Sequence, residues 1–374
     1  MINVIFNKKG VFMETILQSF NEKKASYDSF ATSLKSLLNS LLLNERISIH
    51  SLETRVKERD SLERKLFKKD KYRSIDEITD IVGVRIITHY ADDVERVAEV
   101  IEREFSVDKE NSIDKRASLA PDRFGYLSLH YIVSLNKNRS ILGEHKGYKS
   151  LKAEIQIRTI LQHAWAEIEH DIGYKSNTRL PDEIKRKFSR LAGLLEIADD
   201  EFLKIKDYIE EYREKINREI KHGDSDIPIN TLSLFEYAER SNSIDVIFDI
   251  INTKSTYKFT PSLNTEHIDI ADSVIKGLDF IGIQTINDLD SLIKNNSELA
   301  AWRVISMNDR LKDFFSKNNL PKLSVIALLI QAIIALKNDK EVEKNFANKV
   351  MTAIPSEGIE GFFERIRTGL AHPH

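Results

Sequence analysis

Alternating apolar and polar positions predict β-strands in the first half of the chain. Three segments carry this pattern: IVGVRIITHY (81–90), DRFGYLSLHYIV (122–133) and LKAEIQIRT (151–159). In the second segment, the face expected to meet solvent carries Tyr126, Ser128 and His130 instead of the usual Lys, Glu or Thr. We therefore expect this face to line a binding site.

The strand expected at 151–159 has two chemically distinct faces, because successive side chains point to opposite sides of a strand. Its apolar face holds Ala153, Ile155 and Ile157. Its other face holds a carboxylate, an amide and a guanidinium, from Glu154, Gln156 and Arg158. Such a row suits a polar site, and a sheet face exposed to water is the alternative.

Apolar residues at helical spacing predict helices around these strands. The expected helices cover 12–70 with a break near 44–51, then 92–105, 160–176, 182–217 and most of 231–374. Residues 219–230 are polar, contain Gly and Pro and show no periodicity, which predicts a domain boundary. We expect an α+β domain over 1–220, with a mixed β-sheet flanked by helices, and a mostly helical domain over 221–374.

Composition narrows the class of protein. The 374 residues carry a formal net charge of −3, so no global positive field indicates nucleic-acid binding. The chain has no cysteine, which excludes disulfides, zinc–thiolate sites and cysteine nucleophiles. The longest apolar stretch, 323–336, is shorter than the roughly 20 residues that span a bilayer. The N-terminal apolar run is too short for a signal peptide, and we expect a cytoplasmic protein without a membrane segment.

Asp80 directly precedes the strand expected at 81–90, and Gly83 and Arg85 lie within that strand. Mg²⁺ is usually held by one or two carboxylates together with substrate phosphates, and Asp80 and Glu154 on neighbouring strands would supply that pair. The alternative for Asp80 alone is a turn residue at the start of the strand.

A basic stretch precedes that strand. On the helix expected there, Lys57, Ser61 and Lys65 are spaced i, i+4, i+8 and form one polar stripe, with Arg55 just ahead. Such a stripe could bind triphosphate oxygens, and arginine could bind them bidentately or stack on a base. A solvated charged helix face is the alternative.

A later helix carries His163, Glu167 and His170 on one face. Their spacing matches no zinc pattern. We expect this face to orient the strand residues from behind.

Taken together and in order, these motifs closely resemble the synthetase domain of the RelA/SpoT family. The matching patterns are R-x-K-x-x-x-S-x-x-x-K (55–65), D-x-x-G-x-R (80–85), G-Y-x-S-x-H (125–130) and E-x-Q-I-R-T-x-x-Q-H-A-W-A-E-x-E-H (154–170). The resemblance covers roughly 30–215. It implies an ATP-dependent pyrophosphokinase that moves the β,γ-pyrophosphate of ATP onto a ribose 3′-hydroxyl.

The resemblance also implies roles for single residues. ATP would be bound by Arg55, Lys57, Ser61 and Lys65. Asp80 and Glu154 would hold Mg²⁺, Glu154 would help to deprotonate the attacking hydroxyl, and Arg85 would lie by the phosphates. The acceptor would be bound by Tyr126, stacked on its base, and by Ser128, His130, Gln156 and Arg158.

Two kinds of acceptor occur among small synthetases of this family. One kind makes the alarmone (p)ppGpp from GDP or GTP, and the other, toxic kind modifies the 3′ CCA end of tRNA and blocks translation. The segment 175–190 holds six basic residues against two acidic ones, including Lys175, Arg179, Lys185 and Arg186. Such clustering favours an RNA backbone, and therefore tRNA. A basic helix face paired with acidic neighbours is the alternative.

The region 231–374 is the second feature that favours tRNA. Residues 231–300 hold eleven acidic and five basic side chains. An acidic appendage tethered to a basic site could compete with RNA at high effective concentration. The layout resembles fused toxin–antitoxin proteins of the CapRel type, which implies an enzyme held inactive by its C-terminal domain until a phage-encoded trigger protein binds, in anti-phage defence. A structural or oligomerisation domain is the alternative.

Overall fold

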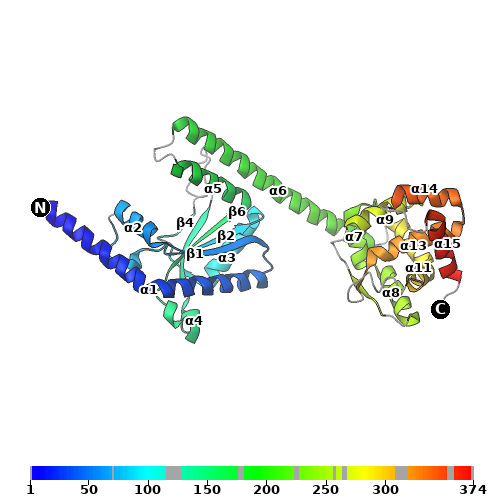
Figure 1. The fold of residues 1–374 in the computed structure, drawn as a ribbon, viewed down its shortest axis with the longest axis horizontal. Coiled ribbons are helices and arrows are strands. Elements are labelled where there is room, and N and C mark those ends of the chain that lie inside the picture. Colours follow the sequence, from blue (N-terminus) through cyan, green and yellow to red (C-terminus); the bar gives the residue numbers. More distant parts are fainter. Residues whose placement is uncertain are drawn as a thin grey trace. The chain divides into compact units, whose positions relative to one another are not determined.

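The computed structural model describes residues 2–69, 71–114, 128–175, 181–222, 227–255, 258–262, 268–307, 319–351 and 358–371 (Figure 1). The chain forms two compact units, Met1–Lys206 and Asp207–His374. The boundary between the units falls within the long helix α6 (Asp182–His222), and the position expected from sequence, between 220 and 221, lies further along the same helix.

The first unit is built on a six-stranded mixed sheet with the path β1-β2-β6-β5-β3 and β4 beside β5. The strands are β1 (Ile49–Val56), β2 (Val82–Thr88), β3 (Phe105–Val107), β4 (Ile113–Asp114), β5 (Leu129–Leu135) and β6 (Ala153–Thr159). β2 and β6 run parallel, and the other pairs are antiparallel. The mixed sheet expected from the sequence is therefore confirmed.

One face of this sheet is covered by helices and forms the core of the first unit. The helices α1 (Ile2–Asn44), α2 (Arg59–Lys68) and α3 (Ala91–Glu104) contribute side chains that are buried together with alternate residues of the strands. Val84 and Ile155 pair across β2 and β6 and both belong to this core. The opposite face of the sheet holds the alternate, polar residues.

The first unit also contains three short helical segments and the longer helix α5. They are the 3₁₀ turns η1 (Ile75–Glu77) and η2 (Gly143–Tyr148), α4 (Lys137–Ser140) and α5 (Ile160–Lys175). Segments as short as α4 and η2 show no periodicity, so the hydrophobic pattern of the sequence gives no signal for them. β5 begins at Leu129, and residues 122–127 of the strand expected at 122–133 lie outside the described part of the chain.

The helix expected over 12–70 is wrong where it covers β1, although α1 and α2 confirm the helix on either side of it. Residues 49–56 form β1, which pairs along its length with β2. Leu52 is buried opposite Ile86, and the alternate residues Glu53 and Arg55 are exposed. Pairing with β2 overrides the helical spacing of the charged residues, which had suggested one continuous stripe.

The second unit is mostly helical, as expected. Its helices are α7 (Thr231–Arg240), α8 (Asn242–Lys254), α9 (Ile268–Phe280), α10 (Ile286–Asn295), α11 (Ser297–Ile305), α13 (Lys322–Lys337), α14 (Lys340–Val350) and α15 (Gly358–Ala371). A short parallel pair of strands, β7 (Thr260–Ser262) and β8 (Asn319–Pro321), completes the described elements.

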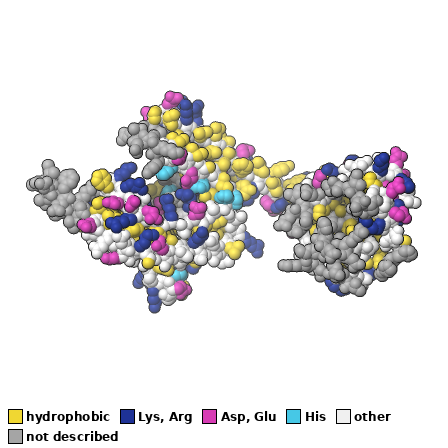
Figure 2. Space-filling model, viewed as in Figure 1, with side chains coloured by type: hydrophobic (Ala, Val, Ile, Leu, Met, Phe, Trp, Pro, Cys, Tyr) yellow, Lys and Arg dark blue, Asp and Glu magenta, His cyan; other side chains and the backbone are white. Residues whose placement is uncertain are grey.

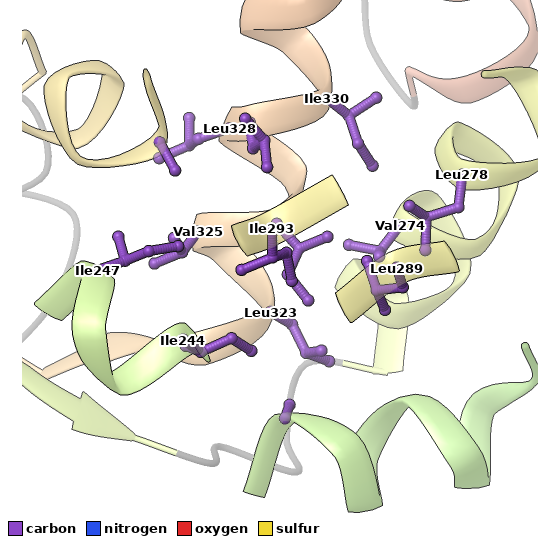
Figure 3. Packing of buried hydrophobic residues seen from close by; sticks show 14 of the residues in the cluster. Ile244, Ile247, Val274, Leu278, Leu289, Ile293, Leu323, Val325, Leu328 and Ile330 are labelled. Atoms are coloured by element: carbon purple, nitrogen blue, oxygen red, sulfur yellow. The ribbon is translucent and has the colours of Figure 1, made fainter. Parts of the chain in front are cut away.

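The core of the second unit surrounds α13, the helix formed by the longest apolar stretch of the chain. Leu323, Val325 and Leu328 on this helix pack with residues of α8 and α10 such as Ile247 and Ile293 (Figure 3). A helix that is apolar on all sides is buried within a protein or a membrane. Here it is buried by its neighbours, and no helix in the described ranges has the length and apolarity needed to cross a bilayer.

A buried carboxyl group attaches α6 to strand β6 of the first unit. Asp199 on α6 is 6% exposed, and Thr159 at the end of β6 donates a hydrogen bond from Oγ1 to its Oδ2 at 2.7 Å. Burial raises the pKa of Asp199 to about 6, because the ionised form loses its hydration. Below about pH 4 this carboxyl is protonated in the folded and unfolded states alike.

Asp199 should make the stability of the first unit fall as the pH rises. Between about pH 4 and 6, Asp199 is ionised in the unfolded chain but still protonated in the folded one. The free energy of unfolding therefore decreases by about 2–3 kcal/mol over this range, and the decrease is complete above about pH 6. Asp199→Asn keeps an acceptor for Thr159 and should be more stable than the wild type at pH 7.5 but not at pH 4. Urea unfolding followed by Trp165 fluorescence, in a Trp302→Phe background, measures the first unit. Glu196→Gln removes an exposed charge from the same helix and should give no such gain.

Candidate active site

Two rows of side chains cross the polar face of the sheet in the first unit. The register places Arg55 opposite Gly83, Gly83 opposite Glu154, and Glu154 opposite Ile132. The next row joins Glu53, Arg85, Gln156 and His130 in the same way. The two rows therefore bring four strands together at one site.

A pocket of about 200 Å³ lies over β1, β2 and β6. Its walls are formed by Glu53, Thr54, Arg55, Lys57, Asp80, Gly83, Val84, Arg85, Glu154 and Gln156. Acidic, basic and histidine side chains are interspersed on the face of the first unit that Figure 2 shows. The pocket thus combines three cations with carboxylates, as a site for phosphates and a metal requires.

Asp80 is held between two lysines. Lys57, which follows β1, donates from Nζ to its Oδ2 at 3.1 Å, and Lys65 on α2 pairs with its Oδ1 at 2.6 Å. Burial alone would raise the pKa of Asp80, but the two ammonium groups outweigh it and hold the pKa below its usual value. The carboxylate is therefore ionised and ready to bind a cation.

The three residues expected on one helical stripe, and Arg55 just ahead of them, come from two elements instead. Arg55 lies on β1, Lys57 follows that strand, and Ser61 and Lys65 lie on α2. The structure brings Arg55, Lys57 and Lys65 to the Asp80 region, but Ser61 is outside the pocket lining and accepts a hydrogen bond from Arg64 at 3.0 Å. The predicted helical stripe is therefore wrong, but the basic residues lie close together near Asp80.

Gly83 allows Arg55 to lie flat on the sheet. A Cβ atom at this position would be 3.5 Å from Cγ and 3.6 Å from Nε of Arg55, in ordinary van der Waals contact. A larger, branched side chain would occupy the space of the guanidinium. The glycine thus leaves this side of β2 open for the side chain of Arg55.

Glu154 is oriented by two neighbours on its own face of the sheet. Its Oε1 is 3.0 Å from Nδ1 of His130, and its Oε2 accepts a hydrogen bond from Nε2 of Gln156 at 3.1 Å. Burial favours a higher pKa for Glu154, but these two contacts prevail and lower it. The nearby charge of Asp80 acts in the opposite direction, which shows that the two carboxylates share one electrostatic environment.

Ser128 contacts the site through His130. Its hydroxyl is 2.7 Å from Nε2 of the imidazole, and the residue is 1% exposed. The hydroxyl therefore faces the histidine, whereas His130 and Gln156 remain partly accessible.

The two carboxylates fit a magnesium ion by their chemistry. Asp80 and Glu154 offer only oxygen ligands, and Mg²⁺ is commonly held by one or two carboxylates with substrate phosphates and water. In the described ranges there is no group of three or more His, Cys, Asp or Glu side chains arranged to hold a metal by itself. Any bound ion would therefore need oxygen atoms from the substrate.

Glu167 on α5 binds the arginines of the site from the helix side. Its Oε1 lies 3.1 Å from Nη1 of Arg85 and 3.6 Å from both Nη2 of Arg158 and Nδ1 of His163. Arg158 is 3% exposed and is outside the pocket lining, so it contacts this carboxylate rather than the cavity. The arrangement agrees with a helix that orients strand residues.

Several residues expected at the site fall outside the described part of the chain. These are Tyr126, Arg179 and the side chain of Lys175. Lys185 and Arg186 are described and lie exposed on α6, where Lys185 pairs with Asp182 at 2.8 Å.

Sequence reasoning missed Glu53, which lines the pocket, and the contact between His130 and Glu154. Glu53 alternates with Arg55, so the correct strand assignment for 49–56 would have placed both on one face. The His130–Glu154 contact depends on the register between β5 and β6, for which a single sequence carries no signal.

Comparison with known proteins agrees with this geometry. Residues 54–179 match the family described as "Region found in RelA / SpoT proteins". The chain belongs to the RelA/SpoT family through residues 54–179. Its fold and motifs are those of an ATP-dependent pyrophosphokinase.

Two relatives come from Bacillus subtilis (strain 168). The chain is 31% identical to GTP pyrophosphokinase YjbM over 150 residues, which are 39% of this chain and 66% of that protein. It is 29% identical to GTP pyrophosphokinase YwaC over 204 residues, or 52% of this chain and 93% of that protein. The crystal structure of small alarmone synthetase 1 from Bacillus subtilis aligns with a TM-score of 0.44 and 28% identity, covering 52% of this chain and 99% of that one.

Removal of the Glu167 charge should shift the titration of His163. Burial, Arg158 and Arg85 lower the pKa of His163, and Glu167 is one of the groups that counteract them. Glu167→Gln should therefore lower the pKa of His163 further below its usual value, as measured by histidine-resolved NMR titration. Glu169→Gln, which changes an exposed acid on the same helix, should leave it nearly unchanged. An upward shift in Glu167→Gln would contradict the proposed arrangement.

Proposed function

We propose that the pocket of the first unit transfers the β,γ-pyrophosphate of ATP to the 3′-hydroxyl of a ribose. The observation that carries this proposal is the meeting of Arg55, Lys57 and Arg85 with Asp80 and Glu154 in one cavity. Transfer of phosphoryl groups needs positioning and charge neutralisation more than covalent help from the protein. These five side chains supply both.

The carboxylates and cations of the pocket are arranged for the following reaction. The acceptor oxygen attacks the β-phosphorus of ATP, the bond from that phosphorus to the oxygen of the α-phosphate breaks, and AMP leaves. Glu154 takes the proton of the attacking hydroxyl, while Lys57, Arg55 and Arg85 hold the phosphate oxygens. Mg²⁺ bound with ATP would neutralise part of the phosphate charge, with Asp80 and Glu154 as its protein ligands.

A guanine nucleotide, GDP or GTP, is the acceptor that the comparisons support best. Both curated relatives are named GTP pyrophosphokinases. In this proposal His130 and Gln156 contact the acceptor and Tyr126 stacks on its base, which would make the product the alarmone (p)ppGpp.

The 3′ end of tRNA is the second candidate acceptor. It is supported by the exposed Lys185 and Arg186 on α6, in a segment that also contains Lys175 and Arg179. Ion pairs within the helix already engage part of this charge, since Lys185 pairs with Asp182 and Lys187 with Glu183 at 3.1 Å. The guanine nucleotide is therefore the first acceptor to test.

The second unit is proposed to regulate the synthetase in the cytoplasm, and to release it when a phage-encoded protein binds. Its own hydrophobic core supports an independent folding unit, as a regulatory domain requires. Purified full-length protein should then gain transferase activity on addition of the trigger. An unchanged rate with every phage lysate that provokes defence would contradict this regulation.

Glu154→Gln should abolish pyrophosphate transfer to any acceptor while the fold is retained. The amide cannot accept the proton and provides a weaker metal ligand, so we expect a loss of at least about 10³-fold in kcat. The measurement is the release of AMP from ATP with GDP, GTP or deacylated tRNA present. Glu53→Gln removes a second carboxylate from the same pocket and should cost much less. Near wild-type activity in Glu154→Gln would exclude the assigned role.

The two acceptors can be separated by reversing charge on α6. Lys185→Glu/Arg186→Glu should weaken transfer to tRNA by about tenfold or more at moderate salt, because phosphate contacts depend on local positive charge. Transfer to GDP should change little. Lys204→Glu, at an exposed basic position further along α6, is the matched control. Label from the γ-phosphate of ATP that reaches GDP or GTP but never tRNA would exclude the tRNA reading.

A further inference from the structure

Glu53 lines the pocket but takes no part in the proposed transfer of pyrophosphate. It is exposed on β1, and the register places it opposite Arg85 on β2. The guanidinium of Arg85 pairs with Glu167 instead, at 3.1 Å. Among the residues that the structure describes, no side chain donates a hydrogen bond to the Glu53 carboxylate or forms an ion pair with it. This carboxylate can therefore accept hydrogen bonds from a ligand in the pocket.

Glu53 lies at the end of the pocket that is remote from the phosphate-binding lysine. Glu53, Arg55 and Lys57 occupy alternate positions along β1 and the residue that follows it, so they lie on one face. At about 3.4 Å per residue, Glu53 and Lys57 are roughly 14 Å apart along the strand. Lys57 pairs with Asp80, where the proposed function places phosphates. The separation is comparable with the distance from the phosphates of an extended nucleotide to its base.

The stereochemistry of the transfer indicates which nucleotide reaches Glu53. In displacement at phosphorus, the attacking and leaving oxygens lie on opposite sides of the phosphorus atom. The proposed acceptor attacks beside Glu154 on β6 and extends towards His130 on β5, so AMP leaves over β1 and β2. With the path β1-β2-β6-β5 and about 4.8 Å between strands, Glu53 is roughly 14 Å across the sheet from His130. Glu53 therefore faces the base of the donor rather than the base of the acceptor.

We propose that Glu53 selects adenine as the base of the pyrophosphate donor, by accepting a hydrogen bond from the exocyclic amino group at C6. This inference rests on the proposed function, which takes ATP as the donor and fixes the ends of the pocket. Adenine carries a hydrogen-bond donor at C6, whereas guanine carries a carbonyl oxygen there. An ionised carboxylate can only accept, so it stabilises the amino group and repels the carbonyl oxygen.

The other groups at this end of the pocket do not supply such selectivity. Arg55, between Glu53 and Lys57, can stack on the face of a base. Stacking tolerates any base, because every base has a π-face. Discrimination between purines must then come from a polar group at the edge of the ring. Glu53 is the carboxylate of the pocket lining on β1, whereas Asp80 and Glu154 are assigned to the phosphate end.

Equilibrium binding of two donors to the full-length chain, without an acceptor, tests the hydrogen bond directly. The probes are ATP and purine riboside 5′-triphosphate, which have equal charge and differ only in the amino group at C6. The wild type should bind ATP more tightly by about tenfold or more, the difference typical of a hydrogen bond to a charged group. Glu53→Ala should bind the two probes about equally, because nothing remains to accept from the amino group.

Glu58→Ala is the matched control for the loss of a negative charge. Glu58 directly follows Lys57, is exposed and lies outside the pocket lining, and its side chain makes no cap hydrogen bond to α2. Its removal changes the field at the phosphates for both probes alike. The preference for ATP over purine riboside 5′-triphosphate should therefore stay as in the wild type.

Glu53→Gln should relax the choice of donor rather than only weaken it. The side-chain amide can either accept from an amino group or donate to a carbonyl oxygen. Inosine 5′-triphosphate, which carries a carbonyl oxygen at C6, should gain on ATP by about tenfold in this variant relative to the wild type. The same shift should occur in kcat/KM when release of the nucleoside monophosphate is measured with GDP as acceptor.

Equal binding of ATP and purine riboside 5′-triphosphate by the wild type would overturn the proposal, as would an unchanged preference in Glu53→Ala. Tighter binding of GTP than ATP would show that Glu53 contacts the N1 and 2-amino edge of guanine, and would overturn it as well. A normal ATP preference without transfer to any acceptor would refute the proposed function alone. Normal transfer without that preference would refute the role of Glu53 alone.

Discussion

The parallel register between β2 and β6 is the constraint on which the site depends. It sets Gly83 beside Glu154 and Arg85 beside Gln156, and antiparallel pairing then adds Arg55 from β1 and His130 from β5. A shift of one residue would turn the charged side chains toward the core and the apolar ones toward the pocket. The buried face, with Val84 and Ile155 at 2% and 0% exposed, opposes that shift.

Pairing among charged and polar side chains, within the sheet and from the helices beside it, completes the site before any substrate binds. Lys57 and Lys65 hold Asp80, His130 and Gln156 hold Glu154, and Glu167 holds the arginines. Asp80, Glu154, Arg85 and Arg158 thus each have a partner from another element or a neighbouring residue. Such preorganisation lowers the cost of arranging the groups during the reaction, and ATP phosphates could exchange with these internal partners.

The helix α6 takes part in both units. Asp199 joins it to the end of β6, and Ile216 is buried in the core of the second unit. Between these positions, Phe202 and Ile205 belong to neither core and are more than half exposed.

The sequence by itself determined the strands at 81–90 and 151–159, the polar faces of both and the family, because alternation and motif order are local properties. It could not determine that Arg55 lies on a strand, because the helical spacing of the residues that follow it, Lys57, Ser61 and Lys65, suggests a helix, and only pairing with β2 decides otherwise. The burial of Ser128 against His130 and the contacts of Glu167 with Arg85 and Arg158 were likewise decided by the tertiary structure. These contacts depend on how strands and helices are packed against one another, and no local pattern encodes that packing.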